Sequence, residues 1–332
     1  MALGRWSLAR LAAALVLCVA VLAGLGTREG RAQDGQPVTC RLGANVEAIY
    51  DIDIANERFG AEFWLWTLCP NGAVDPLESV TFPSATRIAP SPIASVPTGD
   101  ERVYRYRRIQ GTFRQDFDMR AYPFDRQRVV IPIDEFQLGA GSVLFEADPA
   151  SFLTPDSLTN RREWQAGDFA LTTSVSEEQE TYGLPNVAMA RYARAEIAFT
   201  LSRVGMLTFV KLSAGVFAAG VIAMMSFFYD GRESKGFTSR MGLLIGALFA
   251  VLVNLRTADT ALGDMGQMTL VTELHLLTLL LILALAAMAL RDWWRAECAL
   301  PVAYPNWTQF GWTSALYLLG GAYLIGRAAG WA

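Results

Sequence analysis

The sequence has a single histidine and no cluster of Lys or Arg residues. His275 alone, among 332 residues, excludes haem held by paired histidines and His-rich zinc sites. A net charge of −4 without a basic patch argues against a nucleic-acid partner. No nucleophile–base pair, phosphate-binding loop or metal-ligand spacing rises above chance, so we expect no enzyme activity, no cofactor and no metal.

The N-terminus has the composition of an export signal. Arg5 and Arg10 form a charged region, residues 11–25 are apolar, and Gly30-Arg31-Ala32 gives a small-x-small cleavage pattern. We therefore predict a signal peptide over residues 1–32 and a mature chain that begins at Gln33. Export places the next region in an oxidising compartment, where cysteines pair.

The chain after the signal begins with a β-hairpin pattern. Apolar residues occupy every second position from Val46 to Ile54, namely Val46, Ala48, Tyr50, Ile52 and Ile54, and again from Phe59 to Leu65. Folding the chain about the turn at residues 55–57 brings Cys40 and Cys69 together, which predicts a disulfide. We expect Cys298 to be a free thiol.

The remaining exported region reads as further strands separated by loops. Candidate strands lie at residues 103–113, 126–133, 143–145, 169–175 and 195–201, at the spacing of a β-sandwich. Residues 33–203 are thus predicted to form an extracellular (periplasmic) all-β domain.

Residues 204–332 have a membrane composition. Four apolar stretches, near 205–229, 241–262, 268–290 and 310–326, are close to the ~20 residues that cross a bilayer. Arg and Lys residues lie between the first and second stretches and after the third, which places these loops in the cytoplasm. The predicted fold is an all-β sandwich outside the plasma (inner) membrane, followed by an all-α four-helix transmembrane bundle with an outside C-terminus.

One segment resembles a known family. It resembles the signature loop of the pentameric ligand-gated ion channels, the Cys-loop receptor superfamily, in Asp118, Tyr122, Pro123, Phe124, Asp125 and Gln127. The flanking cysteines of animal receptors would fall at Gln115 and Val129, so the chain is more similar to bacterial members, which lack that disulfide. The resemblance implies a homopentamer in lipid, opened by a small-molecule or proton agonist, with a pore lined by the second helix. It also implies that residues 33–203 are the ligand-binding domain.

The resemblance also implies a gating coupler. It places Asp53 of the first hairpin and Asp125 of the signature loop next to Arg203, at the start of the first helix. A guanidinium beside lipid needs carboxylate partners and can bind two of them. Glu163-Trp164 looks like the family's Trp-containing turn.

Two registers fit the second span. Aligning Arg240 with the basic residue at the inner mouth of family pores turns one face to the axis, which consists of Gly242, Gly246, Phe249, Val253 and Arg256. The other register turns Met241, Ile245, Leu248, Leu252 and Leu255 inward. A ring of Arg256 side chains, one from each subunit, would slightly favour anions. The sequence leaves the choice between cations and anions open.

Other features leave alternatives. Trp164, Tyr182 and Tyr192 are candidates for an aromatic ligand pocket or for packing, and His275 for a helix hydrogen bond or a pH sensor. The first span has Gly215 where the family usually has a proline. The function expected is a ligand-gated or proton-gated channel; the alternative is a non-conducting membrane receptor of the same fold.

Overall fold

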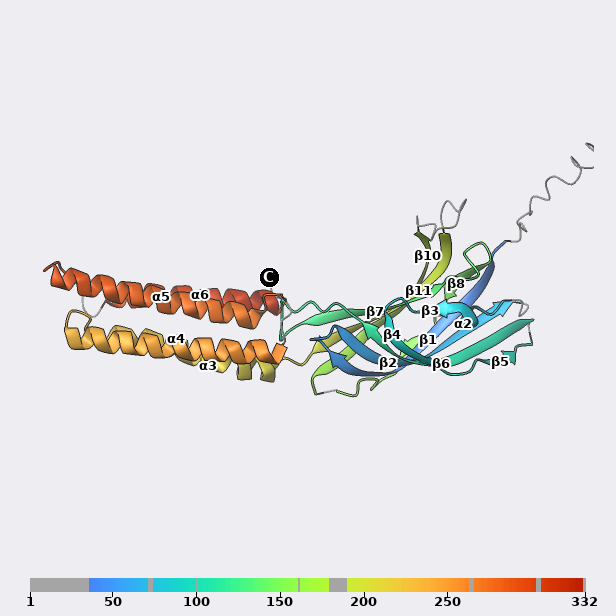
Figure 1. The fold of residues 1–332 in the computed structure, drawn as a ribbon, viewed down its shortest axis with the longest axis horizontal. Helices are drawn as coiled ribbons and strands as arrows, with labels where there is room; N and C mark the ends of the chain where they lie inside the picture. Colours follow the sequence, from blue (N-terminus) through green and yellow to red (C-terminus); the bar gives the residue numbers. More distant parts are fainter. Residues whose placement is uncertain are drawn as a thin grey trace, which may run out of the picture. The chain divides into compact units, whose positions relative to one another are not determined.

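The computed structural model describes residues 36–70, 74–99, 101–160, 162–178, 190–262, 266–302 and 306–330, with the backbone alone at 178, 190 and 259–262. The predicted signal peptide lies outside these residues. Strands occupy the described chain up to Arg203 and helices follow from Met206 (Figure 1). The expected order, a β-rich region followed by helices, is confirmed.

The first sheet is built around the N-terminal hairpin. Strands β4, β6, β2, β1 and β8 lie side by side in this order, with β5 also paired to β6 and β9 to β1. Their bounds are β1 Val38–Asp53, β2 Arg58–Pro70, β4 Ala85–Pro90, β5 Ala94–Pro97, β6 Arg102–Arg114, β8 Val143–Ala147 and β9 Phe152–Leu153. The short helix α2, Pro76–Ser79, follows β2.

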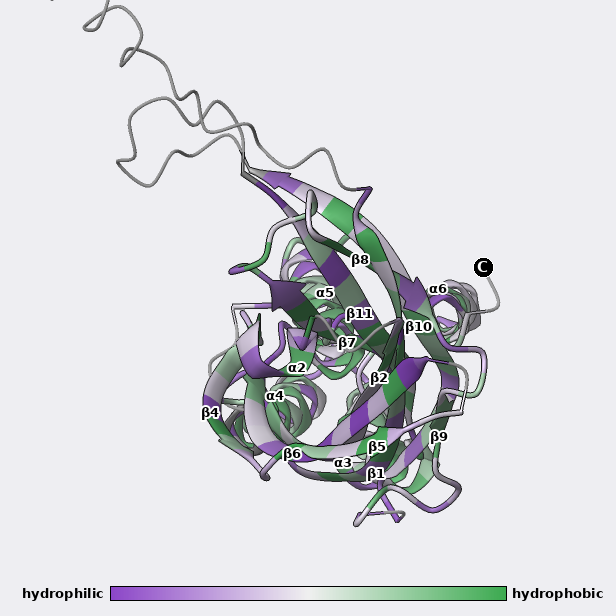
Figure 2. Cartoon of the chain, turned by 90° about the vertical axis from the view of Figure 1, so that its right-hand side faces the viewer, coloured by the Kyte–Doolittle hydropathy of each residue, from purple (hydrophilic) through white to green (hydrophobic). Residues whose placement is uncertain are grey.

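The second sheet carries the chain to the helices. Its strands lie in the order β10, β11, β7, β3, with bounds β3 Val80–Thr81, β7 Arg126–Glu135, β10 Trp164–Glu178 and β11 Ala190–Arg203. Hydrophilic and hydrophobic residues alternate along the strands (Figure 2), as expected when successive side chains point to opposite faces.

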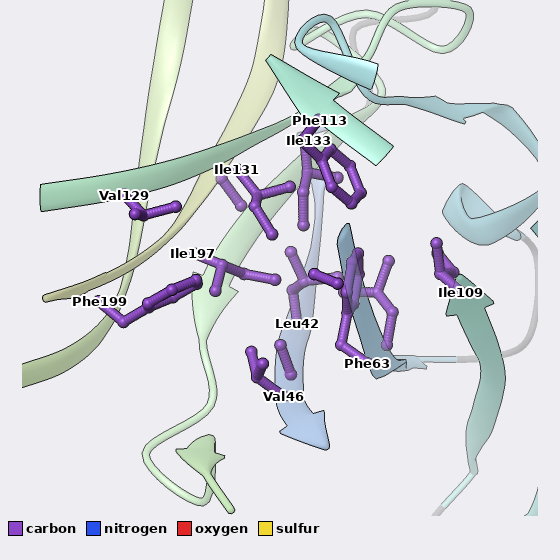
Figure 3. Packing of buried hydrophobic residues seen from close by; sticks show 14 of the residues in the cluster. Leu42, Val46, Phe63, Ile109, Phe113, Val129, Ile131, Ile133, Ile197 and Phe199 are labelled. Atoms are coloured by element: carbon purple, nitrogen blue, oxygen red, sulfur yellow. The ribbon is translucent and has the colours of Figure 1, made fainter. Parts of the chain in front are cut away.

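A hydrophobic core fills the space between the two sheets. Side chains of β1, β2 and β6 point toward those of β7 and β11 (Figure 3). Phe59 belongs to this core, and its ring centroid lies 5.7 Å from that of Phe113 and 6.2 Å from that of Phe199. The two sheets therefore form one packed domain.

The inward face of β1 changes side partway along the strand. Val46 is buried as its alternation predicts, but Ile49 is buried next, while Ala48 and Tyr50 are half-buried. The pairing with β2 shifts between Val46 and Ala48, and such a β-bulge adds one residue and reverses the faces that follow. The expected single face is therefore interrupted at Ala48 and Tyr50, and Ile52 and Ile54 pack against the core again after a second shift in the pairing.

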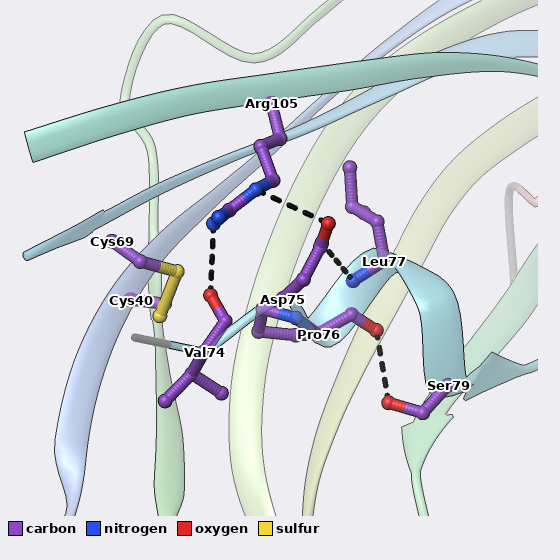
Figure 4. Close-up of a disulfide and its surroundings, with 8 residues drawn as sticks. All are labelled: Cys40, Cys69, Val74, Asp75, Pro76, Leu77, Ser79 and Arg105. Atoms are coloured by element: carbon purple, nitrogen blue, oxygen red, sulfur yellow. Dashed lines mark hydrogen bonds and ion pairs between the residues drawn. A yellow bond between two sulfur atoms is a disulfide. The ribbon is translucent and has the colours of Figure 1, made fainter. Parts of the chain in front are cut away.

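Cys40 and Cys69 form a disulfide across the hairpin, with Cα atoms 4.4 Å apart (Figure 4). The chain beyond Cys69 is held nearby, because Arg105 binds the Asp75 carboxylate at 3.1 Å and the Val74 carbonyl at 2.8 Å. Burial raises the pKa of the Asp75 carboxyl.

Four long helices follow the sheets. They are α3 Met206–Met225, extended by the 3-10 turn η1 Ser226–Phe228, then α4 Ser234–Leu262, α5 Leu270–Glu297 and α6 Trp307–Ala328. A shared apolar core includes Val216 of α3, Val251 of α4 and Leu285 of α5. Helix α4 begins seven residues before its predicted stretch and ends with it, whereas α5 begins two residues later and ends seven residues later than predicted.

Three segments of the described chain are long and apolar enough to cross a membrane: Met206–Phe228, Ser234–Ala258 and Leu270–Glu297. Helix α6 is not among them. Polar and small residues, such as Gln309, Thr313, Ser314 and Gly320, lower its mean hydropathy.

The disulfide provides the first test of this fold. Cys69→Ala should lower the free energy of unfolding by about 3–4 kcal/mol, because the bridge closes a long loop between cysteines 29 residues apart. Urea unfolding followed by tryptophan fluorescence measures the loss. Cys298→Ser is the control, since Cys298 is free and exposed; equal urea midpoints for the two variants would contradict the prediction.

Candidate functional site

The candidate site lies where β11 ends and α3 begins, around a buried arginine. Arg203 Nε donates to Asp125 Oδ1 at 2.8 Å, and its Nη1 donates to Glu163 Oε1 at 2.7 Å. The Arg203 and Asp125 side chains are 2% and 1% exposed. The guanidinium carbon lies 4.0 Å from the Trp164 ring centroid and 4.9 Å from that of Tyr122.

The strand pairing explains why these groups meet. Trp164 stands opposite Arg203 in the β10–β11 ladder, and the Val204 amide donates to the Glu163 carbonyl at 2.8 Å. The Arg203 amide likewise donates to the Asp125 carbonyl at 3.1 Å. Backbone hydrogen bonds thus fix both carboxylate-bearing segments beside the guanidinium.

Asp53 is not part of this ion-pair cluster. Its carboxylate accepts from the Asn56 amide and side chain and pairs with Arg58 at 3.0 Å, within its own turn. The hydrogen bond from Asn56 is the main cause that lowers the pKa of Asp53. Of the three residues expected to form the coupler, the structure therefore joins Asp125 and Arg203 directly, with Glu163 as the second carboxylate.

Asp53 still faces the same space as Arg203. A cavity of about 820 Å³ is lined by both residues together with Tyr122, Glu163 and Arg87. Burial raises the pKa of the Tyr122 phenol, while the nearby Arg203 charge acts in the opposite direction.

Gln127 organises the signature loop. Its Oε1 accepts from the Asp118 amide at 2.9 Å, and its Nε2 donates to the Asp118 carbonyl at 2.8 Å and to Asp125 Oδ2 at 2.9 Å. Both Asp125 oxygens are therefore occupied, one by Arg203 and one by Gln127. The Tyr122–Pro123 peptide is cis.

The signature loop packs against three helices. Buried Phe117 and Met119 form a cluster with Ala258 of α4 and Val271 of α5, and Leu212 of α3 packs on it. The loop is also close to the start of α3: a Cβ at position 205 would lie 1.7 Å from the Pro123 carbonyl oxygen, so the position requires glycine.

The side chain of Gln267, between α4 and α5, binds backbone groups of the same loop. Its Oε1 accepts from the Met119 amide at 2.8 Å, and its Nε2 donates to the Phe117 carbonyl at 3.1 Å. The Leu270 amide, at the start of α5, donates to the Arg120 carbonyl at 3.1 Å. Neither Gln267 nor Glu163 was a predicted site residue; only the position of Glu163 beside Trp164 marked it.

One face of α4 is not covered by the other described helices. All five residues of the first pore register are exposed, with Phe249 62% and Val253 66% exposed. A Cβ added at Gly242 or Gly246 would meet no atom within 4 Å. In the second register, only Ile245 and Leu252 are exposed.

Arg240 does not lie on that uncovered face. It is 4% exposed, its Nη1 lies 3.5 Å from Asp292 Oδ2 of α5, and its guanidinium is 5.7 Å from the Phe227 ring centroid. The side chain turns toward α5 and is paired there, so Arg240 does not share a face with the residues of the first register.

The structure of one chain does not bring Trp164 and Tyr192 of the candidate aromatic pocket together. Trp164 lies against Arg203, whereas Tyr192 packs on Phe136, with ring centroids 5.4 Å apart. Tyr192 is paired with Ser176, twelve residues from Trp164 along β10, which corresponds to about 40 Å. Tyr182 lies outside the described residues.

No protein-family model matches the chain, and no curated protein matches it. Within the described ranges, no three His, Cys, Asp or Glu side chains gather in a way that could hold a metal ion. The site consists of ion pairs and hydrogen bonds that form a joint between the second sheet and the helices.

The two aspartates provide a matched test of the joint. Asp125→Asn should lower the free energy of unfolding by about 3–5 kcal/mol, because it removes one partner of a buried ion pair. Asp53→Asn should cost less than about 1 kcal/mol, since its pair with Arg58 is exposed to solvent. Denaturant unfolding of the purified protein measures both, and an equal cost would show that Asp125 is not the buried anchor.

Proposed function

We propose that the chain is one subunit of a pentameric ion channel gated by a small molecule or by protons, with α4 lining the pore. The fivefold stoichiometry comes from the resemblance of the signature loop to that family. The proposal is supported by the β-rich region, the three apolar segments that can cross a membrane and the joint between them.

The uncovered face of α4 carries the proposal. Arg256 is exposed within a membrane-crossing segment, on the same face as Phe249 and Val253. A charged side chain costs about 2.5–3.5 kcal/mol at the centre of a lipid-exposed helix and less toward the end of a span, where Arg256 lies. Such residues normally face water or a partner. A ring of α4 helices around a water-filled axis gives Arg256 that environment.

The apolar part of this face would form the gate. Phe249 and Val253 are the most exposed large apolar side chains between Gly246 and Arg256. A ring of such side chains excludes water from a narrow pore, so it stops ions without a physical plug. Gly242 and Gly246 would leave the inner half wide.

The signature loop would carry movement from the sheets to the gate. It is tied to Arg203, which precedes α3 by only two residues, and to Gln267, which follows α4. A displacement of β11 or of the loop therefore acts on both neighbours of the proposed gate. The agonist that causes this displacement is a small molecule or a proton.

The inner membrane and the orientation belong to the same proposal. Arg327, in the last turn of α6, forms an ion pair with Glu273 in the first turn of α5. Helix α6 thus runs back toward the signature loop, as a fourth span with an outside C-terminus would. Arg232 and Lys235 then lie in the cytoplasm, in agreement with the positive-inside rule.

Ion flux tests the proposal directly. The purified protein in lipid vesicles should pass ions during a screen of pH 4 to 8 and a panel of small amines and acids. Phe249→Ser should produce flux without any agonist, since a polar ring stays wet. Leu280→Ser is the matched control, because Leu280 is equally exposed but lies on α5, and it should leave the closed state unchanged.

Two outcomes would contradict the channel. If native mass spectrometry gives an oligomer other than a pentamer, the proposed fivefold stoichiometry is wrong. Intact pentamers without flux under every condition, including the Phe249→Ser variant, would favour the non-conducting receptor.

A further inference from the structure

The outer half of α4 is hydrogen-bonded to two neighbouring helices through one side chain. Asn254 Nδ2 lies 2.9 Å from the Leu212 carbonyl oxygen of α3 and 3.1 Å from His275 Nε2 of α5. The amide has room there because residue 215 is glycine: a Cβ at this position would lie 3.2 Å from the Asn254 amide. Gly215 thus accommodates a side chain of the neighbouring helix.

The second bond requires one tautomer of the histidine. His275 is completely buried, and its Nδ1 lies 2.7 Å from the Val271 carbonyl oxygen. A carbonyl oxygen only accepts, so Nδ1 donates, and Nε2 of the neutral ring is left to accept from Asn254. Both hydrogens of the Asn254 amide are then used, one toward each neighbouring helix.

A second polar contact holds the inner half of α4. Arg240 reaches Asp292 of α5, and it precedes Asn254 by fourteen residues in the same helix. Fourteen residues are two heptads, so the two side chains project from nearly the same side, about 21 Å apart. Between them lie the buried apolar residues Leu244, Ala247 and Val251.

Apolar packing alone fixes the rotation of a helix poorly in a membrane, where lipid is as apolar as the neighbouring helix. Hydrogen bonds depend on direction and therefore specify rotation. Asn254 and Arg240 point toward α3 and α5, and the face with Gly246, Phe249 and Val253 points away as a consequence.

We propose that Asn254 and His275 are positioning residues that set the rotation of α4 and thereby select which of its faces is uncovered. Together with the Arg240–Asp292 pair they hold the helix at both ends. The consequence for a pore rests on the proposed function, but the rotation itself does not.

Reactivity of introduced thiols with N-ethylmaleimide tests the proposal on the full chain in detergent, in a Cys18→Ser, Cys298→Ser background, in which Cys40 and Cys69 are joined in a disulfide. This small reagent enters the micelle and does not need a conducting pore. Val253→Cys, on the uncovered face, should react at least tenfold faster than Val251→Cys, which is packed between helices. Adding Asn254→Leu, which is similar in volume but makes no hydrogen bonds, should reduce this ratio at least fivefold.

Changes at the two partner positions distinguish positioning from general loosening. His275→Leu should lower the ratio as Asn254→Leu does, and the double variant should lower it no further. His275→Gln keeps an acceptor for Asn254 and should retain the ratio. Gly215→Ala should lower it by displacing the amide, whereas Gly311→Ala, where nothing lies within 4 Å, should not.

The oligomer size and the unfolding midpoint of each variant show that it is folded. An unchanged ratio in folded Asn254→Leu and His275→Leu would overturn the proposal, as would an equal loss in His275→Gln. If the variants lower the ratio of the two thiol reaction rates but the protein shows no ion flux, the positioning role stands and only the proposed channel function is contradicted.

Discussion

The rest of the structure depends on the burial of one guanidinium at the end of a sheet. An unpaired charge at the position of Arg203 would be strongly unfavourable. Arg203 is instead paired with Asp125 from the signature loop and with Glu163 at the start of β10. Each carboxylate comes from a different loop, so the charge aligns these loops with β11. Trp164 and Tyr122 cover the planar group and exclude water from it.

The signature loop connects this charge to the helices through backbone groups. Gln127 binds Asp125 on one side and the Asp118 backbone on the other, and Gln267 then binds the next residues of the loop. Both glutamine side chains bind backbone atoms of the loop. The connection between the sheet and the helices therefore depends more on the backbone conformation of the loop than on its side chains. Sheet and helices are thereby joined by a continuous set of directional contacts.

Much of the architecture could be predicted from local patterns in the sequence. The alternation from Phe59 to Leu65 gave the second strand and its buried face, and the turn between the strands brought the two cysteines together. The bulge in β1 could not be foreseen, since it depends on pairing with β2 and leaves no distinct composition.

The site was predictable where a residue type demands a partner and unpredictable where several partners compete. An arginine at the predicted membrane boundary needs carboxylate partners, so the sequence predicted them for Arg203, and Asp125 is one of them. Asp53 instead binds Asn56 and Arg58, because groups within its own turn are closer than Arg203. The ion pair of Arg240 could not be predicted for a similar reason: its partner Asp292 lies 52 residues away in sequence, and only tertiary packing brings it near.

The contact between Gly205 and Pro123 also limits which other sequences can build this joint. With the carbonyl oxygen 1.7 Å from where a Cβ would stand, even alanine is excluded, although glycine contributes no chemistry of its own. The dependence of Arg203 on its carboxylates and of position 205 on the absence of a side chain together make Arg-x-Gly a compact sequence signature. A distant relative is better recognised by those two positions than by the length or hydropathy of its helices, which many unrelated membrane proteins share.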